Sequence, residues 1–429
     1  AGVVAPAASA DAAVAQGTYH PVTSSRLLDT RSGLGAPKQP LGPGATLQLT
    51  VAGRGGVPTS GAAAAVINIT VQSPTASSFL TAYPSGQARP ATSSINYQVG
   101  GTRANIATVP LGTGGKIAIY NNSGSTSVIV DVVGFYASAA TTTEGNEFAA
   151  VTPNRLFDTR NDVEGPLAGK SILTTYIDFG TNGDQNSSVR ALAVNVTAVG
   201  AQGSGYLSAW DGNGSPPATS TLNFADSGAV ANMAVVKTAL CSDCGTPPPV
   251  QFGVYNGSAD TVHVFVDLVG VYYNDGTVGL RFSPLTPVRI SDSRKPLNGT
   301  PLAAGQTQQL TAPSSVADSS TVALVTNVAA VQPTSTTFLT LWKGGDARPP
   351  VSNLNAHAGS TVANGAVIEL SSTNKFNIYN NAGTTNFLID VTGRFRGPST
   401  SSAQQQTSKV SGFRTLNATS ERRTDSSSR

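Results

Sequence analysis

A long internal repeat is the feature that most constrains this chain. The hexapeptide RLLDTR at residues 26–31 returns as RLFDTR at 155–160 and as RISDSR at 289–294. After each copy the same landmarks follow in the same order: an apolar strand with a central Asn, an Ala-Asn pair, a Tyr-Asn pair and a closing apolar strand with one Asp. Because chance does not preserve such an order three times, the sequence predicts three copies of one domain.

The landmarks set the boundaries of the three copies. The closing strands VIVDVVGFY, VFVDLVGVY and FLIDVTGRF contain Asp131, Asp267 and Asp390. We therefore expect an N-terminal arm (1–18), repeat 1 (19–137), a linker (138–148), repeat 2 (149–274), a linker (275–281), repeat 3 (282–396) and a C-terminal arm (397–429).

Each copy predicts a β-domain. It holds about eight runs of four to nine residues, rich in Val, Ile, Thr, Tyr and Phe and separated by turn clusters such as NNSG and GTGG. Met occurs once and Glu five times in 429 residues, so little helix is expected. We predict an all-β protein of three tandem antiparallel sandwiches, jelly-roll or Greek-key-like, about eight strands each, with extended arms.

The short polar linkers suggest that the three sandwiches lie end to end in an extended array. Alternation in Lys116–Tyr120 suggests that one face of each sheet packs on a core while the other meets water. Closed barrels and propeller blades are the competing architectures, but a propeller needs at least four blades.

Charge and hydropathy exclude two classes of partner. Five cations against two anions give residues 397–429 the chain's whole net charge of +3, which leaves residues 1–396 neutral. A neutral body offers no clustered cations for a nucleic-acid backbone, so nucleic acid is not an expected partner. No apolar stretch reaches the roughly 20 residues that cross a bilayer, so no membrane span is expected.

Two features favour an exported protein. The small-residue run AGVVAPAASADAAVAQ at 1–16 is typical of the stretch around and beyond a signal-peptidase site, and we interpret it as a mature N-terminus. Cys241 and Cys244 are the only cysteines and predict a local disulfide. A redox pair or half of a zinc site would need a thioredoxin-like context or further ligands, and neither is evident.

The repeat resembles the Arg-Leu-Leu-Asp-Thr-Arg β-domains of exported surface proteins from high-GC Gram-positive (actinobacterial) bacteria. The resemblance covers residues 20–396, and its most specific segments are HPVTSSRLLDTR (20–31), FLTAYPSGQARPATSSINY (79–97) and SVIVDVVGFY (127–136). It implies a secreted, extracellular or cell-surface location. It does not imply an activity, because fold and family stop short of function.

The repeated charged motif has two interpretations. It is a fork that recognises sugar carboxylates, or an internal ion pair that anchors the first strand, and we favour the structural role. Since an aspartate among apolar neighbours needs a partner, we expect Asp131 to pair with Arg26 or Arg31. An Ala substitution at Asp131 should then destabilise repeat 1 alone. The motif set is Arg26, Asp29, Arg31, Asp131, Arg155, Asp158, Arg160, Asp267, Arg289, Asp292, Arg294 and Asp390.

The repeated asparagines are expected to bridge turn backbones rather than bind calcium, because no dense acidic loop accompanies them. They are Asn68, Asn96, Asn105 and their equivalents. His20, His263 and His357 occupy different places in their repeats, and no GxSxG or HExxH motif occurs. We therefore expect no enzyme activity, no metal and no cofactor.

Two further features bear on function. An aromatic recurs after the second landmark strand, as Tyr83, Trp210 and Trp342, and these are candidate platforms for a cell-wall polysaccharide, although a core role is the simpler interpretation. In the C-terminal arm, the VSGFRTL segment with Val410, Phe413 and Leu416 could add a strand to a partner.

These observations predict a non-catalytic structural protein of a cell surface or extracellular filament or lattice, self-assembling as a homo-oligomer or polymer through its arms and domain ends. The alternative is an array of carbohydrate- or cell-wall-binding modules, as in an adhesin or the binding part of a secreted hydrolase.

Overall fold

The computed structural model of the chain describes residues 17–138, 145–276, 279–295, 297–397, 413–416 and 421–424. Strands dominate these residues, and the helical elements among them are two 3₁₀ turns, η1 (Thr113–Gly115) and η2 (Asn186–Ser188). The all-β prediction is confirmed.

Each repeat is a sandwich of two four-stranded antiparallel sheets. In repeat 1 the inner sheet has the order β1 (Gly17–Asp29), β8 (Ser127–Ser138), β3 (Ala62–Gln72), β6 (Thr102–Pro110). Its outer sheet has the order β2 (Thr46–Thr50), β7 (Lys116–Asn121), β4 (Ser78–Pro84), β5 (Ile95–Tyr97). Counted along the chain these orders are 1-8-3-6 and 2-7-4-5, the strand order of a jelly roll with two Greek keys.

Repeats 2 and 3 have the same topology. The inner sheet of repeat 2 is β9 (Glu147–Asp158), β17 (His263–Tyr273), β11 (Val189–Val199), β14 (Val230–Lys237), and its outer sheet is β10 (Ser171–Phe179), β16 (Val250–Asn256), β12 (Gly205–Trp210), β13 (Leu222–Phe224). A short β15 (Ala239–Leu240) also pairs with β16. The inner sheet of repeat 3 is β18 (Arg281–Asp292), β25 (Asn386–Arg396), β20 (Thr321–Val331), β23 (Thr361–Glu369), and its outer sheet is β19 (Thr307–Thr311), β24 (Lys375–Asn380), β21 (Thr337–Lys343), β22 (Leu354–Ala356).

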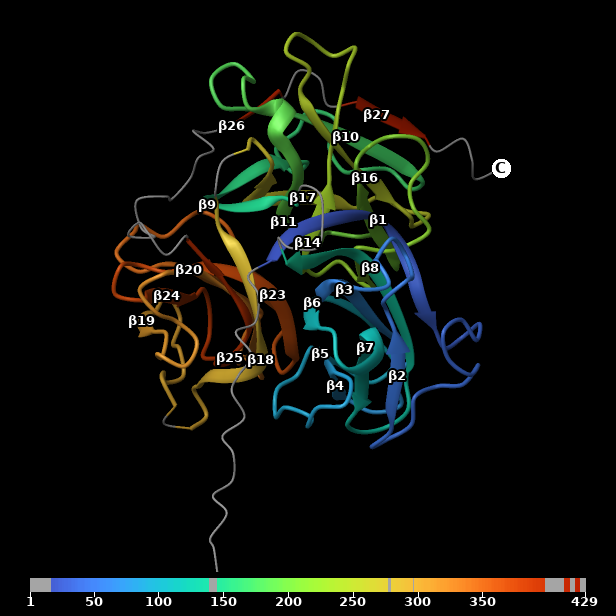
Figure 1. Ribbon diagram of the computed structural model, residues 1–429, viewed down its shortest axis with the longest axis vertical. Coiled ribbons are helices and arrows are strands. Elements are labelled where there is room, and N and C mark those ends of the chain that lie inside the picture. Colours follow the sequence, from blue (N-terminus) through green and yellow to red (C-terminus); the bar gives the residue numbers. More distant parts are fainter. Residues whose placement is uncertain are drawn as a thin grey trace, which may run out of the picture.

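The three sandwiches are grouped around a common centre, with their inner sheets facing it (Figure 1). The first strands meet there: Gly17 pairs with Phe282, and isolated bridges join Tyr19 to Asn146 and Phe148 to Leu280. The expectation of an extended, end-to-end array is therefore wrong.

A central apolar core explains this grouping. Each repeat has its own core between its two sheets, and a further cluster of buried residues draws on all three repeats. Inner strands such as β11 and β20 are accordingly buried on both faces, whereas β2 and β19 alternate exposed and buried residues. The expected one-sided burial holds for these outer strands and is wrong for the inner sheets.

Six aromatic side chains, two from each repeat, form the middle of the central core. They are Tyr19, Tyr136, Phe148, Tyr272, Phe282 and Phe395. In each repeat the closing-strand ring contacts the first-strand ring of a different repeat, with ring centroids 4.1 Å apart for Tyr136–Phe282, 4.0 Å for Phe395–Phe148 and 4.4 Å for Tyr272–Tyr19. Repeat 1 thus packs on 3, repeat 3 on 2 and repeat 2 on 1, which closes the ring.

A glycine repeated in the closing strands makes room for these rings. A Cβ at Gly134, Gly270 or Gly393 would overlap the ring of Tyr19, Phe148 or Phe282 respectively, the first-strand aromatic of the same repeat. The backbone of the closing strand therefore approaches the ring at a distance that any side chain would prevent.

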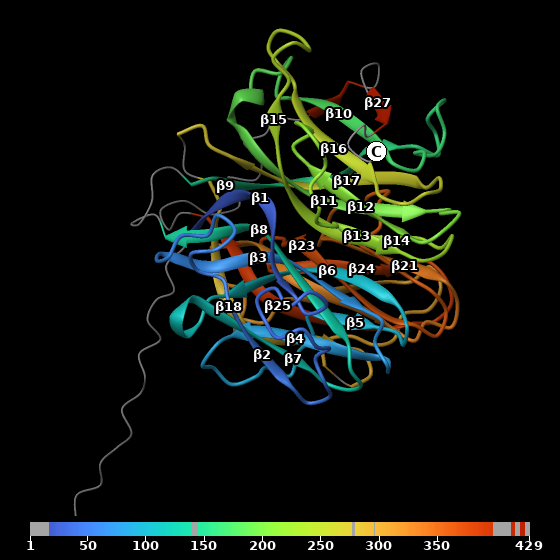
Figure 2. The same cartoon turned by 90° about the vertical axis from the view of Figure 1, so that its right-hand side faces the viewer.

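The C-terminal arm returns to repeat 2 of its own chain. Two short strands, β26 (Phe413–Thr415) and β27 (Glu421–Thr424), pair antiparallel with β10 at the edge of the outer sheet (Figure 2). Val410, which we expected to take part, and the N-terminal arm up to residue 16 lie outside the described residues. Within the described part of the chain, no helix has the length and apolar character to cross a membrane.

Candidate functional site

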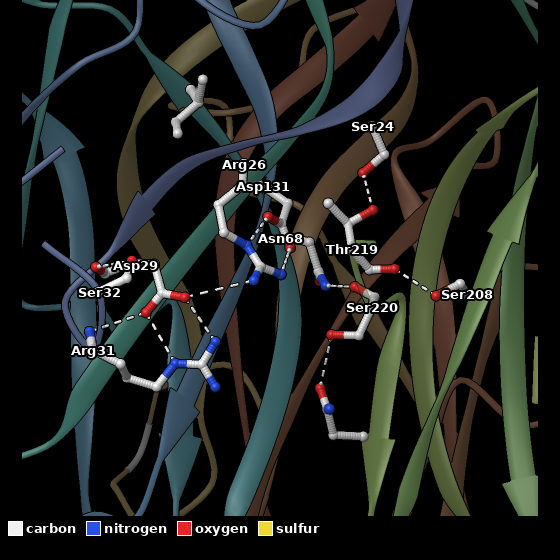
Figure 3. Close-up of polar contacts among 12 residues, drawn as sticks. Ser24, Arg26, Asp29, Arg31, Ser32, Asn68, Asp131, Ser208, Thr219 and Ser220 are labelled. Atoms are coloured by element: carbon white, nitrogen blue, oxygen red, sulfur yellow. Dashed lines mark hydrogen bonds and ion pairs between the residues drawn. The ribbon is translucent and has the colours of Figure 1, made fainter. Parts of the chain in front are cut away.

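The charged motif forms a chain of alternating charges in repeat 1 (Figure 3). Arg26 donates to Asp131 from Nε at 2.9 Å and from Nη2 at 3.3 Å, and its Nη1 lies 3.6 Å from Asp29. Arg31 donates to Asp29 from Nε at 2.9 Å and from Nη2 at 2.7 Å. The carboxylate of Asp131 is fully buried, and each of its oxygens accepts an N–H from Arg26.

Repeats 2 and 3 build the same chain. Arg155 and Arg289 donate from Nε to Asp267 and Asp390 at 2.9 and 2.7 Å. Arg160 and Arg294 donate from Nε to Asp158 and Asp292, at 2.8 Å in both cases.

A β-bulge brings Arg26 and Asp29 to the same side of β1. The pairing of β1 with β8 shifts register between Arg26 and Leu28, and β18 shifts likewise against β25 between Arg289 and Ser291. Without this extra residue, strand alternation would send the two side chains to opposite faces.

The electrostatics differ between the two kinds of aspartate. Hydrogen bonds from Arg31 and Arg294 hold the pKa values of Asp29 and Asp292 below their ordinary value. Burial opposes this at Asp158, but the hydrogen bonds of Arg160 still leave its pKa lowered. At Asp131, Asp267 and Asp390, burial raises the pKa despite the arginine partners. The charged groups are engaged with one another, as an internal anchor requires.

Six repeated asparagines join the repeats. Asn232 donates to Asn68, Asn364 to Asn195 and Asn105 to Asn327, in each case from Nδ2 to Oδ1 at 2.9 Å and from one repeat to another. The acceptor oxygens of the donating asparagines in turn receive backbone N–H groups from Ile106, Met233 and Gly365 at 3.2, 2.9 and 3.0 Å. All six asparagines are buried.

This amide ring goes beyond the expected role. We predicted bridges to turn backbones, which describes Asn121, whose Nδ2 donates to the carbonyls of Leu41, Gly42 and Gly124. Asn68 and Asn105 also donate to loop carbonyls, those of Ser220 and Ser94, and in addition they hold one repeat against another. The sequence showed which asparagines recur but not that their partners lie in a different copy.

The three candidate platform aromatics are largely buried. Tyr83, Trp210 and Trp342 are 8%, 9% and 7% exposed. The indole Nε1 of Trp210 donates to the carbonyl of Asn213 at 3.0 Å, and that of Trp342 to the carbonyl of Asp346 at 2.9 Å. The two tryptophans nevertheless line grooves between adjacent repeats.

One of these grooves is open. Trp210 of repeat 2 faces Val22 to Ser24 of repeat 1 across a cavity of about 260 Å³, whereas the equivalent groove at Trp342 encloses about 20 Å³. An ion pair lies beside each groove with its charges reversed: Lys343 contacts Glu369 at 2.7 Å, while Lys237 and Asp211 are 3.7 Å apart.

Repeat 2 has a second cavity beside its charged motif, where the loop after the motif is placed differently from those of repeats 1 and 3. In repeats 1 and 3 the loop after the motif folds back, and the backbone N–H of Asp29 or Asp292 donates to the carbonyl of Leu34 or Leu297 at 2.9 Å. The corresponding Val163 is fully exposed, and the bridges found among the described residues include none from Asp158 to this loop. A cavity of about 410 Å³ lies beside it, lined by Phe157, Val163 and Leu173 among others.

The docked arm accounts for the position of this loop. Arg422 lies 2.9 Å from Asp162 and 2.7 Å from Glu164, and it donates to the carbonyls of Glu164, Gly165 and Pro166. The sequence did not reveal this contact, because the arm and the loop are 260 residues apart.

The remaining sequence candidates are placed as follows. Cys241 and Cys244 are joined by a disulfide in the loop between β15 and β16. Among the described residues, no group of three or more His, Cys, Asp or Glu side chains has the arrangement of a metal site.

Comparison with known proteins finds no matching family model and no matching curated protein. A solved structure described as "The Triple Jelly Roll Fold and Turret Assembly in an Archaeal Virus" aligns with 90% of this chain and 91% of its own at 13% identity and a TM-score of 0.18. A second, "Life in the extremes: atomic structure of Sulfolobus Turreted Icosahedral Virus", aligns with 84% of this chain and 85% of its own at 13% identity and a TM-score of 0.16. Because these TM-scores are low, the jelly-roll assignment rests on the strand order alone.

Proposed function

We propose that this chain is a secreted, non-catalytic structural protein, a subunit of a bacterial cell surface or extracellular assembly. The observation that carries this proposal is that the repeated polar residues bond to one another. The motif arginines and aspartates pair with one another inside each repeat, and the asparagines join the repeats to one another. Residues that recur in all three copies thus stabilise the three sandwiches as one body.

A body of this kind suits a load-bearing role. Its apolar centre, its amide ring and the pairing of its first strands each tie all three repeats together, so separating one repeat would break contacts on two sides. Two further features support export: the local disulfide, which persists in oxidising compartments, and the resemblance to exported surface domains.

Electron microscopy and light scattering of the purified chain over a range of concentrations test this proposal. We expect filaments, sheets or defined oligomers as the concentration rises. A chain that stays monomeric throughout, including on isolated cell-wall material, would rule out the structural role.

A second candidate function is saccharide binding at the open groove of Trp210. The cavity combines an indole edge with the polar side chains of Thr23, Ser24 and Asp211, a mixture suited to a sugar ring. Pull-down on peptidoglycan and common polysaccharides tests it, with Trp210→Ala as the site variant. Trp342→Ala is the matched control, because its indole is equally buried but its groove is closed. Loss of binding in both variants, or no binding by the unaltered chain, would exclude the groove as the site.

A further inference from the structure

The edge strand β10 of repeat 2 differs from its counterparts in repeats 1 and 3. All nine of its residues are buried, whereas β2 and β19 have five residues each and expose several of them. Aligned by their partners across the sheet, Thr50 of β2 and Thr311 of β19 correspond to Tyr176. β10 therefore continues three residues beyond the others, as Ile177, Asp178 and Phe179.

This extension receives the first arm strand. Phe413, Arg414 and Thr415 pair with Phe179, Asp178 and Ile177, and the backbone N–H of Leu416 donates to the carbonyl of Tyr176 at 2.9 Å. The second strand, residues 421–424, pairs with residues 174–171 farther along β10. An added strand of this kind gains affinity from backbone hydrogen bonds and specificity from its side chains.

Side chains at both ends of the arm segment match the acceptor. Arg414 donates to Asp178 at 2.9 Å, and Phe413 packs on the repeat 2 core with its ring centroid 6.1 Å from that of Phe179. At the other end Arg422 contacts Asp162 and Glu164. Two arm cations thus meet three acceptor carboxylates on a body whose net charge is zero.

Repeat 2 provides both halves of this acceptor. Its longer β10 receives the aromatic end of the segment, and its opened loop at 162–166 receives Arg422. In repeats 1 and 3 the corresponding loops fold back onto their own motif aspartates.

We propose that β10 and the 162–166 loop form a strand-acceptor site that binds residues 413–416 and 421–424 of a second copy in the register described above. This inference rests on the proposed structural function and names the joint between subunits. Every copy of the chain has the same arm segment and the same acceptor. The segment of a neighbouring copy therefore makes the same contacts as the chain's own. Exchange of an identical element is a low-cost route to association.

The tether sets the concentration at which exchange occurs. Fifteen residues, 398–412, connect the arm segment to repeat 3, and such a connection spans at most about 50 Å. A segment tied to its acceptor by so few residues has an effective concentration there on the order of millimolar. Binding in trans therefore prevails where neighbours are packed at comparable density, as in a surface assembly.

Variants that each add one cysteine to the full chain, with the Cys241–Cys244 disulfide kept, test the exchange. Ser171 pairs directly with Thr424, so a chain carrying Ser171→Cys and another carrying Thr424→Cys should form a disulfide-linked heterodimer when mixed under mild oxidation. The yield should rise with concentration and exceed that of either variant alone at least several-fold. The matched control mixes Thr424→Cys with Thr46→Cys, which lies on β2, the corresponding edge strand of repeat 1, and should not cross-link. Equal yields in both mixtures, or monomers alone in the first, would overturn the proposal.

The double variant Ser171→Cys/Thr424→Cys separates this inference from the proposed function. Oxidised in dilute solution, it locks each arm onto its own β10. If the arm is the joint, the locked chain stays monomeric at concentrations where the unaltered chain assembles. If the locked chain assembles equally well, the strand-exchange inference fails while the structural function stands.

Discussion

At the scale of single residues, the sequence predicted that the buried aspartates would be paired, but it did not predict all of their partners. An aspartate inside an apolar closing strand must find a cation, and Asp131 pairs with Arg26, one of the two arginines expected. The choice between Arg26 and Arg31 could not be predicted, because it depends on a bulge in β1 that re-aims the side chains. The amide ring was also beyond prediction, since Asn68 and Asn232 are 164 residues apart.

Replacing Asp131 by Ala should destabilise the whole molecule by about 3 kcal/mol, because it removes a fully buried carboxylate and leaves the Nε and Nη2 donors of Arg26 without their acceptor. Chemical denaturation measures the change. Asp226→Ala is the control, since that side chain is 67% exposed. Loss of repeat 1 alone, with the rest unchanged, was the expectation from sequence, and it conflicts with the shared core; observing it would contradict the present account.

Stability should not decline from pH 7 to about 4 and should fall below that. The folded pKa values of Asp29, Asp158 and Asp292 are lowered, so their stabilisation is present above the unfolded pKa of about 4 and is lost as the pH falls through the folded pKa. Burial raises the folded pKa values of Asp131, Asp267 and Asp390, which acts oppositely and adds stability as the pH falls toward 4.

Free energies of unfolding measured at several pH values give this profile, and Asp29→Asn should flatten its acid limb. A decline that begins between pH 7 and 5 would argue against these assignments.

At the scale of elements, the eight short strands of each repeat were predictable from their composition and turn residues, and the jelly-roll order was among the expected topologies. The burial of β11 and β20 on both faces was not predictable, because a continuous apolar run in a sandwich strand does not show what covers its second face. The second face of these strands is covered by neighbouring repeats.

Arg422→Ala should release the end of the arm from the 162–166 loop. Since Arg422 makes charge-assisted hydrogen bonds to Asp162 and to three carbonyls, its loss should weaken docking by about 2 kcal/mol. We expect amide hydrogen exchange along β10 to become about 10-fold faster or more. Lys38→Ala, an exposed change in repeat 1, should have no effect; unchanged exchange in the Arg422 variant would mean that the arm does not protect this edge.

At the scale of the whole molecule, the repeat count was predictable but the arrangement was not. The signal was present: an aromatic recurs in each first strand and each closing strand, at Tyr19 and Tyr136 in repeat 1. From the sequence, each of these six rings is expected in the core of its own repeat, because the sequence does not show that the three copies pack together. Short linkers are compatible with an extended array and with a ring, and the shared apolar centre decides between them.

Three tyrosines in that centre should resist ionisation. Burial raises the pKa values of Tyr19, Tyr136 and Tyr272, and Tyr136 and Tyr272 share a hydroxyl contact of 2.6 Å. Absorbance titration should therefore show at least three of the 11 tyrosines remaining protonated well above pH 10 until the chain unfolds. Their folded pKa is raised, so stability declines as the pH rises above the unfolded value of about 10. Ready titration of all 11 would show an open centre.

The most direct test of the central claim, that three jelly rolls form one interlocked body, is differential scanning calorimetry of the intact chain. We predict one transition whose calorimetric and van't Hoff enthalpies agree, with Asp131→Ala lowering that single midpoint. Separate transitions for the three repeats, or a repeat 1 transition that moves alone in the variant, would contradict it.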